Sequence, residues 1–128
     1  METYIKEALW RQYGAAIAML GNVMQACPEE LWRVRLWRDA GMPAGFSEFW
    51  YVAYHTLFWL DLYLSGAVVG FAPPSPFTLD ELDPAGVLPE RVFAKAELLS
   101  YLDHCRAKAR TVILELTDEG AHRQCRFV

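Results

Sequence analysis

The 128-residue sequence has no paired cysteines, no long uninterrupted hydrophobic run and no excess of basic residues. Its three cysteines, Cys27, Cys105 and Cys125, are far apart, so neither a disulfide framework nor a Cys-x-x-Cys zinc motif is expected, and the cytoplasm is the predicted location. Charged residues and a histidine divide the most apolar segment, which argues against a membrane-spanning helix. The net charge of −4 argues against nucleic acid as a partner.

The sequence also lacks the short motifs that mark common enzyme sites. It has no Gly-x-Ser-x-Gly nucleophile motif, no glycine-rich phosphate-binding loop and no His-Glu-x-x-His zinc motif, so the catalytic residues are unknown at this stage. What it has in abundance is apolar residues, which make up 54% of the chain and include five tryptophans. This is more apolar surface than one small core needs.

Apolar residues recur at three- and four-residue steps in three segments, which predicts an all-α fold in a single domain over residues 1–128. The predicted helices cover about 2–26, 47–65 and 93–118. The second helix is apolar and aromatic on nearly every side, so other elements are expected to surround it. The first helix is expected to present a broad core face, formed by Ile5, Leu9, Tyr13, Ala16, Ile17, Leu20, Val23 and Met24.

Local signals predict the ends of the second helix. Ser47 is a candidate N-cap, because its hydroxyl can accept a hydrogen bond from a backbone N–H of the first turn. Phe46 is placed to pack on Tyr51 one turn further along. Gly66 can adopt the left-handed conformation that ends a helix.

The segment 66–92 is much longer than a usual connection and is rich in proline. We expect it to be either a functional lid or a crossover that spans the length of a helical bundle. Thr78 and Glu81 have the spacing of a capping box, which predicts a single helical turn. The tail, residues 119–128, has no apolar periodicity and is expected to be irregular.

His55, near the middle of the second predicted helix, is the candidate metal ligand. It shares a helix face with aromatic and apolar residues, and a neutral imidazole in such surroundings can bind zinc, nickel or iron. One histidine does not make a metal centre, which needs at least three protein ligands. The alternative is a buried histidine hydrogen-bonded to a backbone or tyrosine partner.

Several other residues carry weaker signals. Tyr51 and Trp59, one turn to either side of His55, are candidate neighbours of its site. Asp61 is either another such neighbour or part of the exposed side of the helix. His104 lies on the expected solvent side of the third helix. Cys105 lies on the apolar stripe of that helix and is expected to be a buried, unreactive thiol.

Four segments carry a family resemblance. They are FWYVAYHTLFWLDLYL in the second predicted helix, PPSPF and LDPAGVLPER in the long connection, and AELLSYLDHCRAKAR in the third helix. With them the chain resembles the DinB-like superfamily of metal-dependent proteins over nearly its whole length. The resemblance implies an up-down bundle of four helices with a long crossover between helices 2 and 3. It also implies a divalent metal, often zinc or nickel, bound by one histidine of helix 2 and a His-x-x-x-His pair of helix 4.

His55 matches the first of these histidines, but no segment matches the fourth helix or its histidine pair. We therefore expect a bundle truncated to three main helices, with an incomplete metal site. A full-length form is expected, from the resemblance, to use zinc or nickel as a hydrolase or as a transferase of a small thiol substrate.

An open apolar groove is expected where the fourth helix would lie. Large apolar patches are rarely left in contact with water, so we expect either a fragment of a longer product or a homodimer whose copies cover each other. The alternative function is a non-catalytic helical module that dimerises or binds a partner helix through this groove.

Overall fold

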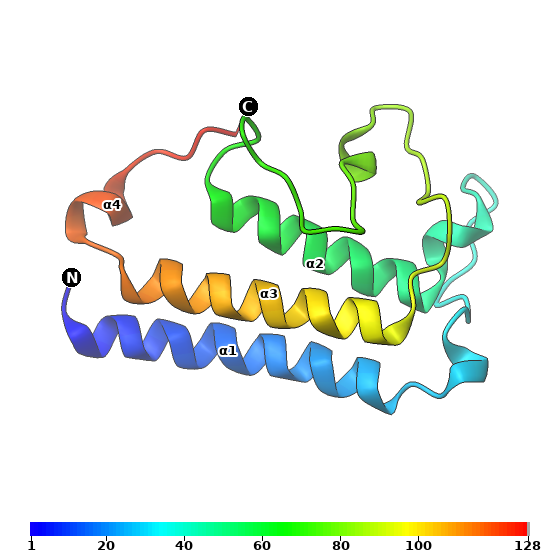
Figure 1. Ribbon diagram of the computed structural model, residues 1–128, viewed down its shortest axis with the longest axis horizontal. Coiled ribbons are helices and arrows are strands. Elements are labelled where there is room, and N and C mark those ends of the chain that lie inside the picture. The colour runs from blue at the N-terminus through cyan, green and yellow to red at the C-terminus, as the bar shows by residue number, and fades with distance from the viewer. Residues whose placement is uncertain (128) are drawn as a thin grey trace.

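Three long helices lie side by side in the computed structural model, which describes residues 1–127 (Figure 1). They are α1 (Thr3–Ala26), α2 (Phe49–Ser65) and α3 (Lys95–Leu114). α3 lies in the middle and packs against both α1 and α2. Within residues 1–127 no strand forms, and β pairing is limited to two isolated bridges. The predicted all-α fold is therefore confirmed.

The crossover between α2 and α3 allows these two helices to run in the same direction, opposite to α1 (Figure 1). Phe77 fixes the crossover to the helices, because its ring stacks on Tyr101 of α3 with 4.3 Å between centroids and on Tyr54 of α2 with 5.8 Å. Such contacts between aromatic rings stabilise a fold beyond the area that they bury. The segment is therefore an ordered crossover packed on two helices.

The predicted ends of α2 are partly confirmed. Gly66 has a φ of 78°, the left-handed conformation that ends the helix, and the Phe46 and Tyr51 rings are in edge contact at 5.2 Å. The predicted N-cap is wrong, because Ser47 belongs to the 3-10 turn η2 (Ala44–Ser47), where its hydroxyl donates to the carbonyl of Ala44. Glu48 takes the N-cap position without a side-chain capping bond.

The third helix and the tail also differ from prediction. α3 ends at Leu114, and the tail that we expected to be irregular contains the short helix α4 (Asp118–His122). The hydroxyl of Thr117 accepts a hydrogen bond from the backbone N–H of Gly120 and so caps this turn. Two further 3-10 turns, η1 (Glu29–Leu31) and η3 (Asp80–Leu82), interrupt the connections.

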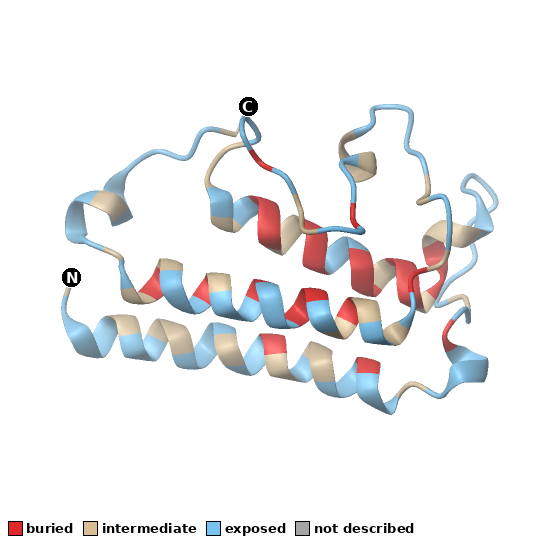
Figure 2. Ribbon diagram, in the orientation of Figure 1, coloured by how far each residue is buried: buried red, intermediate tan, exposed pale blue. Residues whose placement is uncertain are grey.

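The core is built mainly by α2 and by the face of α3 that meets it, whereas α1 contributes little (Figure 2). In α1, Ile17 and Met24 are the buried residues. Gly21 of α1 faces Leu102 of α3, since a Cβ at this position would be in ordinary van der Waals contact with the Leu102 side chain, at 3.4 Å. α2 is not surrounded on every side as predicted, because His55 and Tyr63 are exposed. No helix within residues 1–127 has the length and apolar character needed to cross a membrane.

Candidate functional site

A buried carboxylate of the crossover binds three side chains of α2. Glu81, in η3, has only 4% of its side chain exposed. It accepts hydrogen bonds from the Tyr51 hydroxyl, from Nδ1 of His55 at 2.5 Å and from Nε1 of Trp59 at 2.9 Å. We call these four residues the Glu81 cluster.

The Glu81 cluster follows from helix geometry. Tyr51, His55 and Trp59 are four positions apart, so in an α-helix they lie one above another on the same face. Their rings are neighbours, with centroids 5.9 Å apart for Tyr51 and His55 and 6.2 Å apart for His55 and Trp59. The helix thus presents a row of three hydrogen-bond donors.

The predicted helical turn forms as η3, but Thr78 and Glu81 do not form the predicted capping box. Thr78 accepts a hydrogen bond from the backbone N–H of Asp80. The Glu81 side chain does not return to Thr78, because it is bound to α2. Sequence analysis singled out Glu81, but the capping motif predicted Thr78 as its partner instead of the side chains of α2.

Two opposing effects set the protonation of Glu81. Burial raises the pKa of the Glu81 carboxyl, whereas the hydrogen bonds from His55, Tyr51 and Trp59 lower it, and the net result is a lowered pKa. Burial, followed by the hydrogen bond to Glu81, raises the pKa of Tyr51. The cluster therefore holds an ionised carboxylate beside a protonated tyrosine.

The surroundings of His55 match neither the apolar metal site nor the buried histidine that the sequence suggested. Its side chain is 50% exposed, so it is not a core residue, and its partner is a carboxylate instead of a backbone or tyrosine group. Because Glu81 is ionised and can only accept, Nδ1 of His55 carries a proton and donates to the carboxylate, so Nε2 is the ring nitrogen left for another partner. Within residues 1–127, Nε2 has no hydrogen-bond partner.

The residues around His55 do not make a complete metal centre. Glu81 is its nearest candidate co-ligand, and both oxygens of that carboxylate already accept hydrogen bonds. Nowhere in the part of the chain that the structure describes do three His, Cys, Asp or Glu residues come together in a way that could hold a metal ion. At least three protein ligands are needed, so this chain by itself does not fit the expected zinc or nickel site.

A second buried carboxylate, Asp61, joins α2 to α3. Asp61 is fully buried and accepts hydrogen bonds from the Tyr101 hydroxyl at 2.8 Å and from Nζ of Lys108 at 2.6 Å. Nε2 of His104 lies 3.4 Å from the same oxygen that Lys108 binds. Lys108 also reaches the hydroxyl of Ser65 at 2.6 Å.

Both predictions for Asp61 are wrong in detail, since it is neither exposed nor part of the site at His55. One signal could have revealed its role: Tyr101, His104 and Lys108 follow at three- and four-residue steps, which gives α3 a polar row able to face a carboxylate. His104 is partly exposed, with 43% of its side chain accessible, which agrees with the predicted solvent side of the helix, but it also faces Asp61.

Cys105 is buried as predicted, and its thiol lies 3.5 Å from the carbonyl of Leu57. Burial, reinforced by the negative charge of Asp61, raises the pKa of the Cys105 thiol to about 12. A thiol in this environment stays protonated at neutral pH and is a poor nucleophile.

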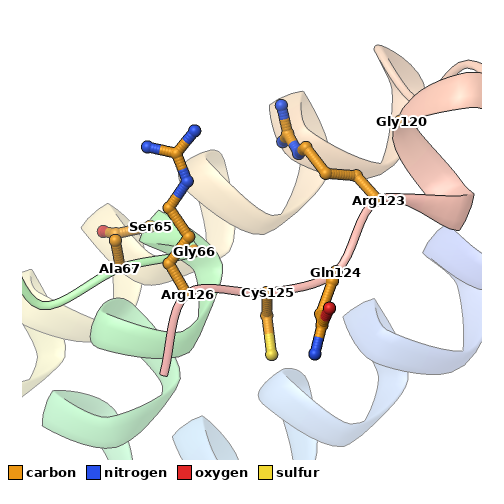
Figure 3. Close-up of a pocket in the computed structure, with 8 residues that line it drawn as sticks. All are labelled: Ser65, Gly66, Ala67, Gly120, Arg123, Gln124, Cys125 and Arg126. Atoms are coloured by element: carbon orange, nitrogen blue, oxygen red, sulfur yellow. The ribbon is translucent and has the colours of Figure 1, made fainter. Parts of the chain in front are cut away.

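A cavity of about 320 Å³ lies between the end of α2 and the tail (Figure 3). It is lined at one side by Ser65, Gly66 and Ala67 and at the other by residues 123–126, which carry two arginine side chains. The backbone N–H of Arg126 donates to the carbonyl of Gly66 and holds the tail in place. None of the predicted site residues lines this cavity.

α1 leaves an apolar face uncovered. Residues of the predicted core face at positions 5, 13, 16 and 23 are exposed, and those at 9 and 20 are half-buried. We call this set the α1 stripe: Ile5, Leu9, Tyr13, Ala16, Leu20 and Val23. The exposed fractions of Tyr13 and Val23 are 51% and 53%.

The prediction of a single core face on α1 is therefore wrong. α3 packs on the side of the helix that carries Ile17, Gly21 and Met24. At about 100° per residue, the α1 stripe lies roughly a quarter turn from that side. The broad apolar face of the sequence consists of two faces, of which α3 covers one.

Comparison of the chain with protein-family models, with curated proteins and with solved structures gives no match.

Proposed function

We propose that this protein is a DinB-like helical-bundle protein that acts as a helix-binding module, with the α1 stripe as its binding surface. The observation that carries the proposal is the exposure of a continuous apolar stripe along a helix whose other face is packed on α3. The expected partner is an amphipathic helix with apolar residues at three- and four-residue steps, because such a helix is complementary to the stripe.

Two observations support the wider proposal. α2 and α3 run in the same direction and are joined by a long ordered crossover, which is the arrangement that the DinB resemblance implies. Cys27, Cys105 and Cys125 are free thiols, which supports the cytoplasmic location that is part of the proposal.

The energy available from the α1 stripe is large enough for specific binding. Full burial of a side chain such as Val or Leu contributes about 1.5 to 3 kcal/mol. Four of the six side chains are exposed and two are half-buried, so covering all six outweighs the entropy that association costs by a modest margin. Binding of moderate strength is therefore expected.

Binding of a fluorescent, designed amphipathic helix with leucines at three- and four-residue steps tests this function. We expect its anisotropy to rise when the wild-type protein is added, and Ala16→Glu to weaken binding at least tenfold by placing a charge in the stripe. Ala15→Glu is the matched control, because Ala15 is also an exposed alanine of α1 but lies about 100° away from Ala16 around the helix. Equal binding by the two variants would contradict the proposal.

The second candidate function is a divalent-metal site at His55, and the hydrogen bond between His55 and Glu81 favours it. Histidines that bind metals commonly donate the other ring N–H to a carboxylate, as His55 does to Glu81. The remaining ligands would have to come from outside residues 1–127, which do not supply them. Hydrolase or thiol-transferase activity with zinc or nickel belongs to this second candidate.

Metal analysis of the purified protein tests the second candidate. Near-stoichiometric zinc or nickel that is lost in His55→Ala and kept in His104→Ala would support it. His104 is the control because it is also a partly exposed histidine beside a buried carboxylate. Absence of metal from wild type at saturating zinc or nickel would rule the candidate out.

A further inference from the structure

The α1 stripe has a symmetry that identifies its partner, and we infer that the partner is the α1 stripe of a second copy, packed antiparallel about a two-fold axis. This inference rests on the proposed function and names the helix that the module binds. In a two-fold dimer the same patch occurs on both sides, so the patch must be complementary to itself. The positions in the stripe can be tested for this property.

The stripe is nearly symmetric about the middle of α1. Its six positions form the pairs 5 with 23, 9 with 20 and 13 with 16, whose midpoints are 14, 14.5 and 14.5 and so agree to within half a residue. An antiparallel second helix centred there places Ile5 against Val23 and Leu9 against Leu20 of the other copy. Each of these contacts occurs twice, once on either side of the axis.

Side-chain size fits this register at the centre. The pair closest to the axis is Tyr13 against Ala16, the bulkiest residue of the stripe against the smallest. Alternation of large and small side chains across facing positions lets two helices approach closely. A parallel arrangement would instead place Tyr13 against Tyr13 and Ala16 against Ala16.

The charge distribution of α1 also favours a second copy. α1 has no Asp, Glu, Lys or Arg from Gln12 to its end at Ala26, although Tyr13 and Val23 of the stripe are exposed there. Uncharged, apolar surface of this kind is typical of the centre of an interface. Two such helices meet without repulsion between like charges, and their antiparallel dipoles attract.

The size of the surface sets the expected affinity. A standard interface buries roughly 800 Å² on each partner, whereas one helix stripe offers less. We therefore expect a reversible dimer with a dissociation constant in the micromolar range. Sedimentation velocity from about 1 to about 100 µM should show the sedimentation coefficient rising from monomer to dimer. Ala16→Glu should stay monomeric over this range, and Ala15→Glu should dimerise like wild type.

Cysteine cross-linking tests the orientation and register. In a background with Cys27→Ser and Cys125→Ser, chains carrying Ile5→Cys are mixed with chains carrying Val23→Cys and oxidised. The antiparallel dimer places these two thiols side by side, so the mixed disulfide should form. Neither variant should cross-link alone, because its two thiols would lie about 27 Å apart along the axis.

The outcomes separate this inference from the function on which it rests. Cross-linking of each variant with itself would indicate a parallel pairing and overturn the inference. A wild-type chain that stays monomeric at about 100 µM but binds the designed helix would overturn the inference and leave the helix-binding function intact. A monomer that binds no helix would overturn both.

Discussion

One carboxylate oxygen of Glu81 lies 2.5 Å from Nδ1 of His55, although the two residues are 26 positions apart in the sequence. The contact joins the crossover to α2, and Tyr51 and Trp59 complete it with two further hydrogen bonds. A carboxylate with 4% of its side chain exposed is stable in this position only because donors surround it.

Loss of the Glu81 side chain should therefore destabilise the protein. Glu81→Ala removes all three hydrogen bonds and leaves the Trp59 N–H and the Tyr51 hydroxyl without their partner. Because hydrogen bonds to charged groups contribute about 1.5 to 3 kcal/mol each and are not additive, we expect a loss of about 3 kcal/mol in the free energy of unfolding. Urea unfolding measures it. Glu90→Ala, at an exposed crossover position, should cost less than about 0.5 kcal/mol.

The lowered pKa of Glu81 predicts the direction of a pH effect. A carboxyl whose pKa is lower in the folded state contributes its full stability above the unfolded value near 4.5, and this contribution is lost as the pH falls through the folded pKa. Wild type should therefore lose stability below about pH 4.5 more steeply than Glu81→Gln, which lacks this titration. Urea midpoints measured from about pH 7 to pH 3 test it, and parallel curves for the two proteins would contradict it.

Replacement of the second buried carboxylate tests the link between α2 and α3. Asp61→Asn removes the charge that binds Lys108 and Tyr101. Breaking a fully buried ion pair costs about 3 to 5 kcal/mol, but the Lys108 side chain is 27% exposed and can turn to water, so we expect about 2 to 3 kcal/mol. Urea unfolding checks this value. Asp103→Asn, an exposed position of α3, is the control and should have little effect.

The cysteines should differ in reactivity. Cys105 is fully buried and its thiol has a pKa raised to about 12, whereas Cys125 is exposed. Iodoacetamide at about pH 8 should therefore modify Cys125 in the folded protein and leave Cys105 unmodified, as measured by peptide mass spectrometry. In urea all three cysteines should react. Rapid modification of Cys105 without denaturant would show that α2 and α3 separate readily.

The sequence predicted the three long helices and a long connection between the second and the third because these features depend on local signals, but it did not distinguish a lid from a crossover. Apolar periodicity marked the helices, Gly66 marked the end of α2, and the proline-rich stretch excluded a regular element. Ser47 misled the prediction of the first turn of α2, since its hydroxyl bonds within the preceding 3-10 turn. A capping signal of one residue does not determine which of two adjacent turns it serves.

The candidate site was predicted less well because its contacts join distant segments. His55 could be selected from the sequence, but its partner Glu81 comes from the crossover, where a capping motif gave a different explanation for the same residue. Asp61 is buried because Lys108 and Tyr101 arrive from α3, and no pattern within α2 shows this. α1 has a wide apolar face in the sequence, and only the packing of α3 shows which half is covered.

The central position of α3 has a consequence for how the protein is made. α1 and α2 each pack against α3, the last of the three long helices to be synthesised. Domains fold on the ribosome only when the segments that they bury have emerged. A nascent chain that stops before Lys95 therefore presents the aromatic side of α2 to chaperones and proteases, and native packing must await the synthesis of α3.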